Sequence, residues 1–183
     1  MVSKLKIMLV IALFIIPVAV KKEVDLDNSN RQVLNQKIKE TVEILTRLAP
    51  DLSTERQIKV AEAIHNNSIK YKISKKILMS IIKVESNFKS EKISYTGDYS
   101  IVQINLKIWN KEFRRLGLPS IDKNKLVKSD DYAVARMCNI LNIIKSRYNK
   151  DPKWYARYHS NTPEYNNIYN RKINKVMKLI ASR

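Results

Sequence analysis

Glycine is almost absent from this chain, since only Gly97 and Gly117 occur among its 183 residues. Loops that cradle phosphates, whether of the dinucleotide-binding or the P-loop type, need several glycines close together, so the sequence excludes both. An all-β fold with many tight turns is also disfavoured, because such turns depend on glycine for their positive φ angles. The chain is therefore expected to be mainly α-helical.

Apolar residues recur at helical spacing through most of the sequence, and capping residues and prolines mark the ends of the helices. A first helix is predicted from about residue 31 to residue 48, with Pro50 ending it. Residues 89–104 break the helical period around the turn Thr96-Gly97-Asp98, and they are predicted to form a small β-hairpin or an irregular lobe. Further helices are predicted to begin at Ser53 or Thr54, Ser74, Asn105, Ser129, Asp151-Pro152 and Thr162-Pro163.

The supply of metal ligands is small. Cys138 is the single cysteine, which excludes an intrachain disulfide and a cysteine-based zinc site. His65 and His159 lie far apart and offer no metal-binding spacing, so neither a metal nor a cofactor is expected. Cys138 stands at helical spacing between Val134 and Leu141, which indicates a place in the core.

The net charge of +18 is extreme for a chain of this length. It indicates an anionic partner, which could be a cell-wall polymer, a nucleic acid or a membrane surface. A second interpretation is that the charge reflects solubility and the Lys, Asn and Ile bias of an AT-rich genome. Charge alone does not choose among these possibilities.

The N-terminus carries an export signal. Lys4 and Lys6 precede the uncharged stretch from Ile7 to Val20, a pattern typical of a signal peptide. The stretch is short for a membrane span, although an uncleaved anchor is the alternative. Export argues against a nucleic-acid partner and for a periplasmic or cell-envelope protein. The predicted domains are a leader at residues 1–20, a linker and helix at 21–52, and a catalytic domain at 53–183.

Glu85 is the candidate catalytic residue. It follows Leu78 by seven residues, Ile81 by four and Ile82 by three, so its carboxylate falls on the buried stripe of the predicted helix. A carboxylate among apolar side chains, near the negative end of a helix dipole, should have a raised pKa. A carboxylic acid that stays protonated near neutral pH is what glycosidic bond cleavage needs as its general acid. The alternative is a structural ion pair with one of the many Lys and Arg residues.

The segment after Glu85 resembles the active-site region of the soluble lytic transglycosylases, which are related in fold to goose-type lysozyme. The resemblance rests on Glu85-Ser86-Asn87-Phe88, on Ser100-Ile101-Val102-Gln103-Ile104 and, more weakly, on Arg157-Tyr158-His159-Ser160 with the later Tyr169. It covers roughly residues 55–180 and implies a lysozyme-like helical domain. Ser100 stands where the family usually has glycine, and His159 stands where it has asparagine.

The resemblance also implies a reaction and roles for particular residues. In this family the glutamate protonates the leaving oxygen and then acts as base on the C6 hydroxyl of the muramic acid residue, which closes on C1 to give a 1,6-anhydro product. By the same resemblance Gln103 supplies hydrogen bonds to the sugar, and Tyr158 and Tyr169 supply ring surface and hydroxyl contacts. Ser86 positions Glu85 or a substrate acetamido group. Each of these four could instead be an ordinary packed residue.

Three classes of function stay open at this point. The first is a peptidoglycan lytic transglycosylase, working in wall turnover, in a secretion or conjugation apparatus, or for a phage. The second is a lysozyme-type hydrolase that uses Asp98 as its second carboxylate, although Asp98 is also a natural turn former. The third is a non-enzymatic basic protein that binds an anionic wall or membrane.

Overall fold

The computed structural model describes residues 31–182, so the predicted leader at residues 1–20 lies outside the described part of the chain. The chain divides into two compact units, Met1–Lys39 and Glu40–Arg183, and the fold below is that of the second unit. Residues 31–48 are helical, as predicted from the periodicity that ends before Pro50. No helix in the described part is long and apolar enough to cross a membrane.

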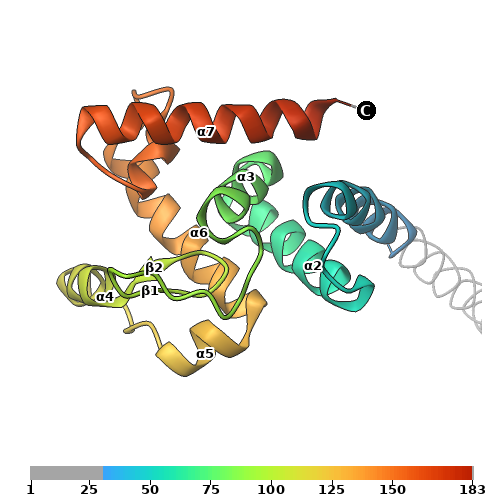
Figure 1. The fold of residues 1–183 in the computed structure, drawn as a ribbon. Helices are drawn as coiled ribbons and strands as arrows, with labels where there is room; N and C mark the ends of the chain where they lie inside the picture. The colour runs from blue at the N-terminus through green and yellow to red at the C-terminus, as the bar shows by residue number, and fades with distance from the viewer. Residues whose placement is uncertain (1–30, 183) are drawn as a thin grey trace, which may run out of the picture. The chain divides into compact units, whose positions relative to one another are not determined.

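The second unit is mainly α-helical, which confirms the predicted fold class (Figure 1). Its strands β1 (Asp98–Tyr99) and β2 (Ile104–Asn105) form a small antiparallel hairpin, with Asp98 opposite Asn105 and Tyr99 opposite Ile104. After the helical residues 40–48, the helices are α2 (Thr54–Tyr71), α3 (Lys75–Ser86), α4 (Leu106–Arg115), α5 (Lys123–Lys128), α6 (Asp130–Arg147), the short 3-10 helix η1 (Trp154–Tyr158) and α7 (Pro163–Ala181).

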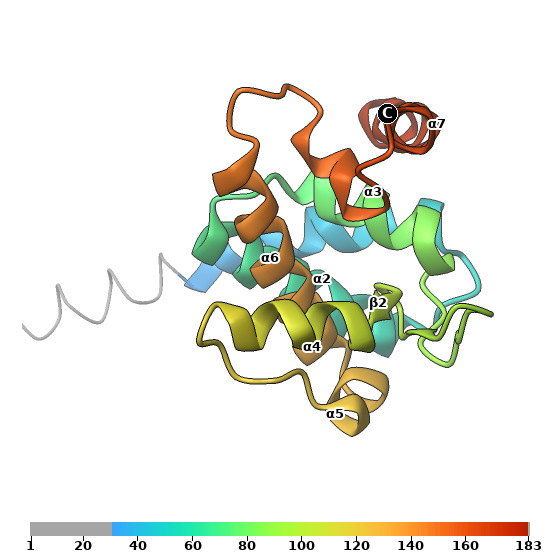
Figure 2. The same ribbon diagram turned by 90° about the vertical axis from the view of Figure 1, so that its left-hand side faces the viewer.

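The helices pack in pairs that are distant in sequence. α2 packs along α6, and α3 packs along α7, while α2 also contacts α3. In Figure 1, α7 lies across the top with α3 beneath it, and α4, α5 and the hairpin lie below; Figure 2 shows the same stacking from the side. The core that these contacts bury includes Ile64, Leu78, Ile81, Ile82, Phe88, Ile101, Met137, Cys138, Leu141 and Ile173. Cys138 is fully buried there, as the sequence predicted.

Local capping explains where most helices begin. The side chains of Ser53, Asn105 and Ser129 each accept a hydrogen bond from a backbone amide in the first turn of the following helix. Ser74 occupies the same position before α3 without such a side-chain bond. These four starts were predicted from the sequence and are confirmed.

One local expectation was wrong. Pro152 does not take the first position of a helix, because η1 begins only at Trp154 and the intervening residues form a turn. The predicted turn around Gly97 is present: Gly97, at φ +79°, donates its backbone amide to the Ser94 carbonyl, and Ile93 and Tyr99 pair across this turn. The chain turns again at residues 100–103, between β1 and β2. A missed element, α5, is six residues long and buries only Leu126.

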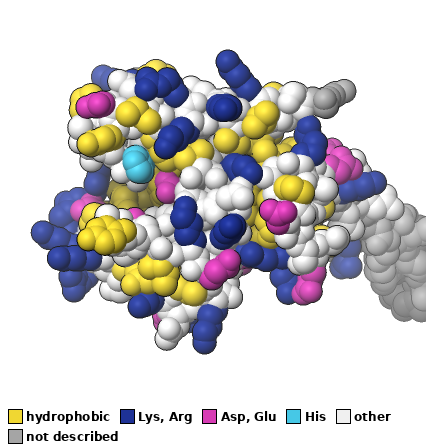
Figure 3. Space-filling model, viewed as in Figure 1, with side chains coloured by type: hydrophobic (Ala, Val, Ile, Leu, Met, Phe, Trp, Pro, Cys, Tyr) yellow, Lys and Arg dark blue, Asp and Glu magenta, His cyan; other side chains and the backbone are white. Residues whose placement is uncertain are grey.

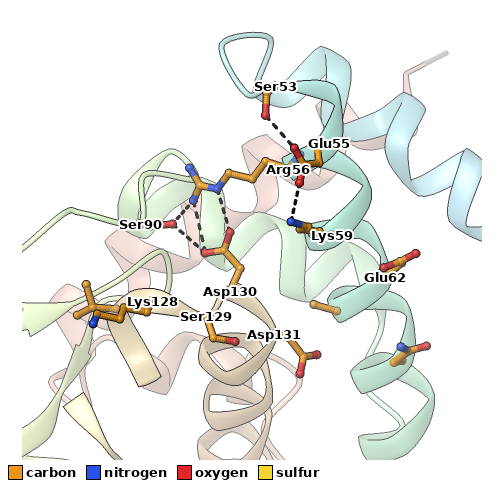
Figure 4. Close-up of a pocket in the computed structure, with 13 residues that line it drawn as sticks. Ser53, Glu55, Arg56, Lys59, Glu62, Ser90, Lys128, Ser129, Asp130 and Asp131 are labelled. Carbon is orange, nitrogen blue, oxygen red and sulfur yellow. Dashed lines mark hydrogen bonds and ion pairs between the residues drawn. The ribbon is translucent and has the colours of Figure 1, made fainter. Parts of the chain in front are cut away.

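A hydrogen-bonded cluster around Arg56 fixes the segment that follows α3 (Figure 4). The Arg56 guanidinium donates to Asp130 Oδ2 at 2.9 Å, to the Phe88 carbonyl at 3.0 Å and to Ser90 Oγ. Ser90 Oγ in turn donates to Asp130 Oδ1 at 2.8 Å. The cluster therefore ties α2, the N-terminus of α6 and the loop after α3 together, at the side of a hollow of about 780 Å³.

Candidate active site

Glu85 is the penultimate residue of α3 and faces a cleft of about 660 Å³. The apolar stripe that predicted its orientation is present, because Leu78, Ile81 and Ile82 are all fully buried and Glu85 is only partly exposed. The loop after α3, the hairpin, α4 and the η1 region supply the rest of the lining: Lys92, Ser94, Thr96, Asp98, Gln103, Asn105, Ile108, Trp109, Arg157, Tyr158, His159, Ser160 and Asn161.

The environment of Glu85 favours its protonated form. Burial raises the pKa of Glu85 from 4.5 to about 7, against the lowering effect of a hydrogen bond from Tyr169. The nearby negative charge of Asp98 raises this pKa further, while Lys92 and Lys172 lower it by smaller amounts. A carboxyl group with a pKa near neutrality can donate a proton and then accept one at the same pH.

Tyr169, on α7, holds the Glu85 carboxyl group in place. Its hydroxyl donates to Glu85 Oε1 at 2.6 Å, and its side chain is almost fully buried. Burial, together with the charge of Glu85, raises the pKa of Tyr169 well above its ordinary value, so the phenol stays a donor. The His159 ring stacks on Tyr169 with centroids 4.8 Å apart and an angle of 8° between the planes. Burial lowers the pKa of His159, as does the charge of Lys172.

Gln103 lies in the hairpin turn and lines the cleft. Its backbone adopts a positive φ of +49°, and its side-chain amide donates to the carbonyl oxygens of Lys92 at 2.8 Å and Ser100 at 2.9 Å. The amide therefore joins the turn to the loop that follows α3. Lys92 also donates through Nζ to the backbone carbonyl of Glu85, so this one residue ties the loop to α3 as well as to the hairpin turn.

Tyr158 and Ser86 connect the hairpin to its surroundings. Tyr158 lines the cleft, but its hydroxyl donates to the Val102 carbonyl at 2.8 Å, and it is Tyr169 that donates to Glu85. Ser86 is 2% exposed and lies outside the cleft lining. Its hydroxyl donates to the Ile101 carbonyl at 2.6 Å and is within 3.3 Å of the Ile82 carbonyl, so it links the end of α3 to the hairpin.

Asp98, the candidate second carboxylate, also lines the cleft. Its Oδ2 accepts from the hydroxyls of Ser94 and Thr96, each at 2.7 Å, and its Oδ1 accepts from Asn105 Nδ2 at 2.9 Å. The Ser94 hydroxyl also accepts from the Asp98 backbone amide at 2.9 Å. The carboxylate is thus held in the network that shapes the turn and the strand after it.

Several cleft residues were not predicted as site residues. Trp109 lines the cleft and meets Phe113 edge to face, with centroids 6.4 Å apart. Lys92, Asn105 and Asn161 carry no motif that separates them from the other Lys and Asn residues of this chain. His159 stood out only as a departure from a family pattern. Among residues 31–182, no cluster of three or more His, Cys, Asp and Glu side chains is placed to hold a metal ion.

A family model described as the Transglycosylase SLT domain matches residues 62–178, which is more than half of the chain. The chain belongs to this family. The matched segment contains Glu85 and every other residue that lines its cleft. SLT domains are lysozyme-like lytic transglycosylases, so at the level of the family this chain is a peptidoglycan transglycosylase that acts on the cell wall. The resemblance found in the sequence is thereby confirmed. No curated protein matches the chain significantly.

Proposed function

We propose that this SLT domain cleaves the β-1,4 bond between MurNAc and GlcNAc and forms 1,6-anhydro-MurNAc, with Glu85 acting first as general acid and then as general base. The observation that carries the proposal is the state of Glu85. It is a cleft carboxyl group with a pKa of about 7, held by a 2.6 Å hydrogen bond from Tyr169. Such a group is suited to give and take a proton near neutral pH.

In the first step Glu85 donates its proton to the glycosidic oxygen. The bond between C1 of MurNAc and that oxygen breaks, the oxygen leaves as a hydroxyl on GlcNAc, and positive charge develops at C1. In the second step the Glu85 carboxylate takes the proton from the C6 hydroxyl of MurNAc. The C6 oxygen attacks C1 and closes the anhydro ring, and Glu85 is again protonated. The Tyr169 hydroxyl stays hydrogen-bonded to Glu85 in both steps. This hydrogen bond stabilises the Glu85 carboxylate more than the protonated acid.

The other predicted site residues take more specific places in this proposal. Gln103 and Tyr158 line the cleft where the sugar would lie, and Tyr169 contacts the catalytic acid instead of serving only as a sugar platform. Ser86 acts through the fold, because its two backbone contacts fix the end of α3 against the hairpin. Its role is therefore to position Glu85, and contact with an acetamido group is the weaker of its two predicted roles.

The rival enzyme class is a hydrolase in which Asp98 activates water. Asp98 shares the cleft with Glu85, and its negative charge raises the pKa of Glu85. In either reaction Asp98 would therefore help to keep Glu85 protonated. Its two oxygens are occupied by side-chain donors, however, and a base needs an oxygen directed at water. We therefore favour the reaction in which the substrate supplies the nucleophile.

The setting of the enzyme rests on the sequence of its N-terminus. We infer that residues 1–20 direct export to the periplasm or cell envelope, either as a cleaved signal or as an anchor. A secretion, conjugation or phage apparatus is a candidate partner, because each must open the wall locally. A net charge of +18 would draw the protein to an anionic wall.

Mass spectrometry of the muropeptides released from purified sacculi tests the proposal. The wild-type chain should release 1,6-anhydro ends, and reducing ends would instead indicate the hydrolase. Glu85→Gln should lose about 2 to 4 kcal/mol or more of barrier lowering, because the amide keeps the shape and lacks the proton. Asp98→Asn should lose far less. Wall binding without release of either product would support the non-enzymatic alternative.

A further inference from the structure

A second hollow, of about 1010 Å³, opens beside the catalytic cleft and is continuous with it. The two share six lining residues, Thr96, Asn105, Ile108, Trp109, Arg157 and Asn161. We call the second hollow the side lobe. Its other lining residues come from α4, the C-terminal part of α6 and the residue that follows α6: Lys107, Lys111, Glu112, Arg115, Ile144, Arg147 and Tyr148.

The side lobe is strongly cationic. Its lining holds five basic side chains and one acid, Glu112, which binds Arg115 at 2.8 Å and also pairs with Arg147. Those cations hold the pKa of Glu112 down, at about 2, so it stays ionised. Arg157 pairs with Asp151, outside the lining, at 2.9 Å. Five positive charges against these two negative charges leave a net charge of +3.

Lys107 and Lys111 supply the charge that no acid neutralises. Neither has an ion-pair partner in the described part of the chain, and both are exposed. They are four residues apart on α4, and Arg115 follows four residues later, so the three cations share one face of that helix. In Figure 3 Lys and Arg side chains gather at the left-hand edge, over the area that α4 occupies in Figure 1.

The lobe also offers apolar contact. Ile144 is buried beneath it, Ile108 is 62% exposed at its junction with the cleft, and the Trp109 ring borders both hollows. Arg157 stacks on the Tyr148 ring with 4.0 Å between the guanidinium carbon and the ring centroid. The lobe therefore fits a substituent that has both carboxylates and aliphatic groups, and not a bare anion.

We propose that the side lobe binds the stem peptide carried by a MurNAc residue of the glycan strand in the cleft. The uncharged sugars of the strand give five cations nothing to bind, whereas stem peptides bear several carboxylates and short aliphatic side chains. The proposal rests on the function proposed above, because a strand must lie in the cleft for its peptide to reach the lobe. On this view Lys107 and Lys111 make the enzyme selective for strands that still carry peptides.

Binding to two forms of one glycan tests this proposal. Uncross-linked strands with stem peptides are compared with the same strands after an amidase has removed the peptides and the lactyl carboxylate so exposed on each MurNAc has been converted to an amide. All affinities are measured in a Glu85→Gln background, so that nothing is cleaved and the result does not depend on which product the active enzyme makes. The test variant is Lys107→Gln/Lys111→Gln. The matched control is Lys175→Gln/Lys178→Gln on α7, which removes the same charge from exposed lysines that line neither hollow.

The test variant should bind peptide-bearing strands about fivefold to tenfold more weakly than its parent, as expected for two partly solvated charge contacts. Its affinity for peptide-free strands and its melting temperature should not change. The control should retain the affinity for both forms. In the active background the same lysine pair should raise KM for peptide-bearing strands with little change in kcat.

Three results would overturn the proposal. Equal weakening on both forms would make the lobe a site for sugars. An equal effect of the control pair would reduce the result to net charge. Unchanged affinity of the test variant for peptide-bearing strands would show that the lobe takes no part in binding. None of these results bears on the reaction at Glu85, whose failure would appear instead as the wrong product from sacculi.

Discussion

Replacing Glu85 with glutamine should stabilise the folded protein at alkaline pH while it abolishes wall cleavage. The cause is the pKa of Glu85, which folding raises from 4.5 to about 7. Below pH 4.5 the carboxyl group is protonated in the folded and the unfolded chain, so it contributes no pH dependence. Between pH 4.5 and 7 the unfolded chain releases the proton and the folded chain keeps it. Stability therefore falls as pH rises through this window.

The size of the effect follows from the shift. A difference of 2.5 between 4.5 and 7, at 1.36 kcal/mol for each pKa unit, gives about 3 kcal/mol of lost stability above pH 7. The glutamine in Glu85→Gln cannot ionise, and its amide oxygen can still accept the Tyr169 hydrogen bond. The variant should thus match the wild type near pH 4 and exceed it by up to about 3 kcal/mol at pH 8.

Urea unfolding at pH 4, 6 and 8 measures this difference directly. Other titrating groups are common to both chains, so their contributions cancel when the two free energies of unfolding are subtracted. If the free energy of unfolding of Glu85→Gln differs from that of the wild type by the same amount at pH 4 and at pH 8, Glu85 is not a buried acid with a raised pKa. The case for Glu85 as a general acid at neutral pH would then lose its physical basis.

Three further predictions concern neighbouring features. Tyr169→Phe removes a hydrogen bond that lowers the pKa of Glu85, so the alkaline fall of kcat/KM should move to higher pH. The measurement is the rate between pH 5 and 9, and a profile that stays in place or moves to lower pH would contradict this prediction. Ser100→Gly should raise the free energy of unfolding by about 1 kcal/mol, because Ser100 has a φ of +70° and a buried hydroxyl with no hydrogen-bond partner in the described structure. Lower stability of the variant in urea would refute this prediction. Arg56→Met should lower the free energy of unfolding by about 2 kcal/mol, because Asp130 loses the cation beside it, and unchanged urea stability would show that the pair is dispensable.

Much of the fold could be predicted because its signals are local. Ser53, Asn105 and Ser129 cap helices through bonds within three residues, and the apolar stripe that turns Glu85 inward lies within one helix. The element that escaped prediction, α5, is too short to show a period. The 3-10 helix begins later than Pro152 suggested. The Asp151 carboxylate accepts a hydrogen bond from the Lys153 backbone amide, and this bond closes a turn ahead of the helix.

The site was predictable only in part because it joins distant segments. Tyr169 reaches Glu85 across 84 positions, and no spacing rule connects the two; only a family pattern pointed to Tyr169. The pattern did not show that the Tyr158 hydroxyl goes to the Val102 carbonyl, or that Ser86 is buried against the hairpin. The side lobe lay beyond prediction for the same reason, since its cations come from three elements.

The packing of α3 against α7 has a consequence for when the enzyme becomes active. Glu85 owes its burial and its hydrogen bond to elements that include Tyr169 on α7, which follows the other described helices along the chain. Until α7 docks, we expect Glu85 to be solvated and to ionise like any surface carboxyl group, with its proton lost well below neutral pH. On the function proposed above, we therefore expect the capacity to cut the wall to arise only when α7 docks, and a chain that is cut short before α7 to leave the wall intact.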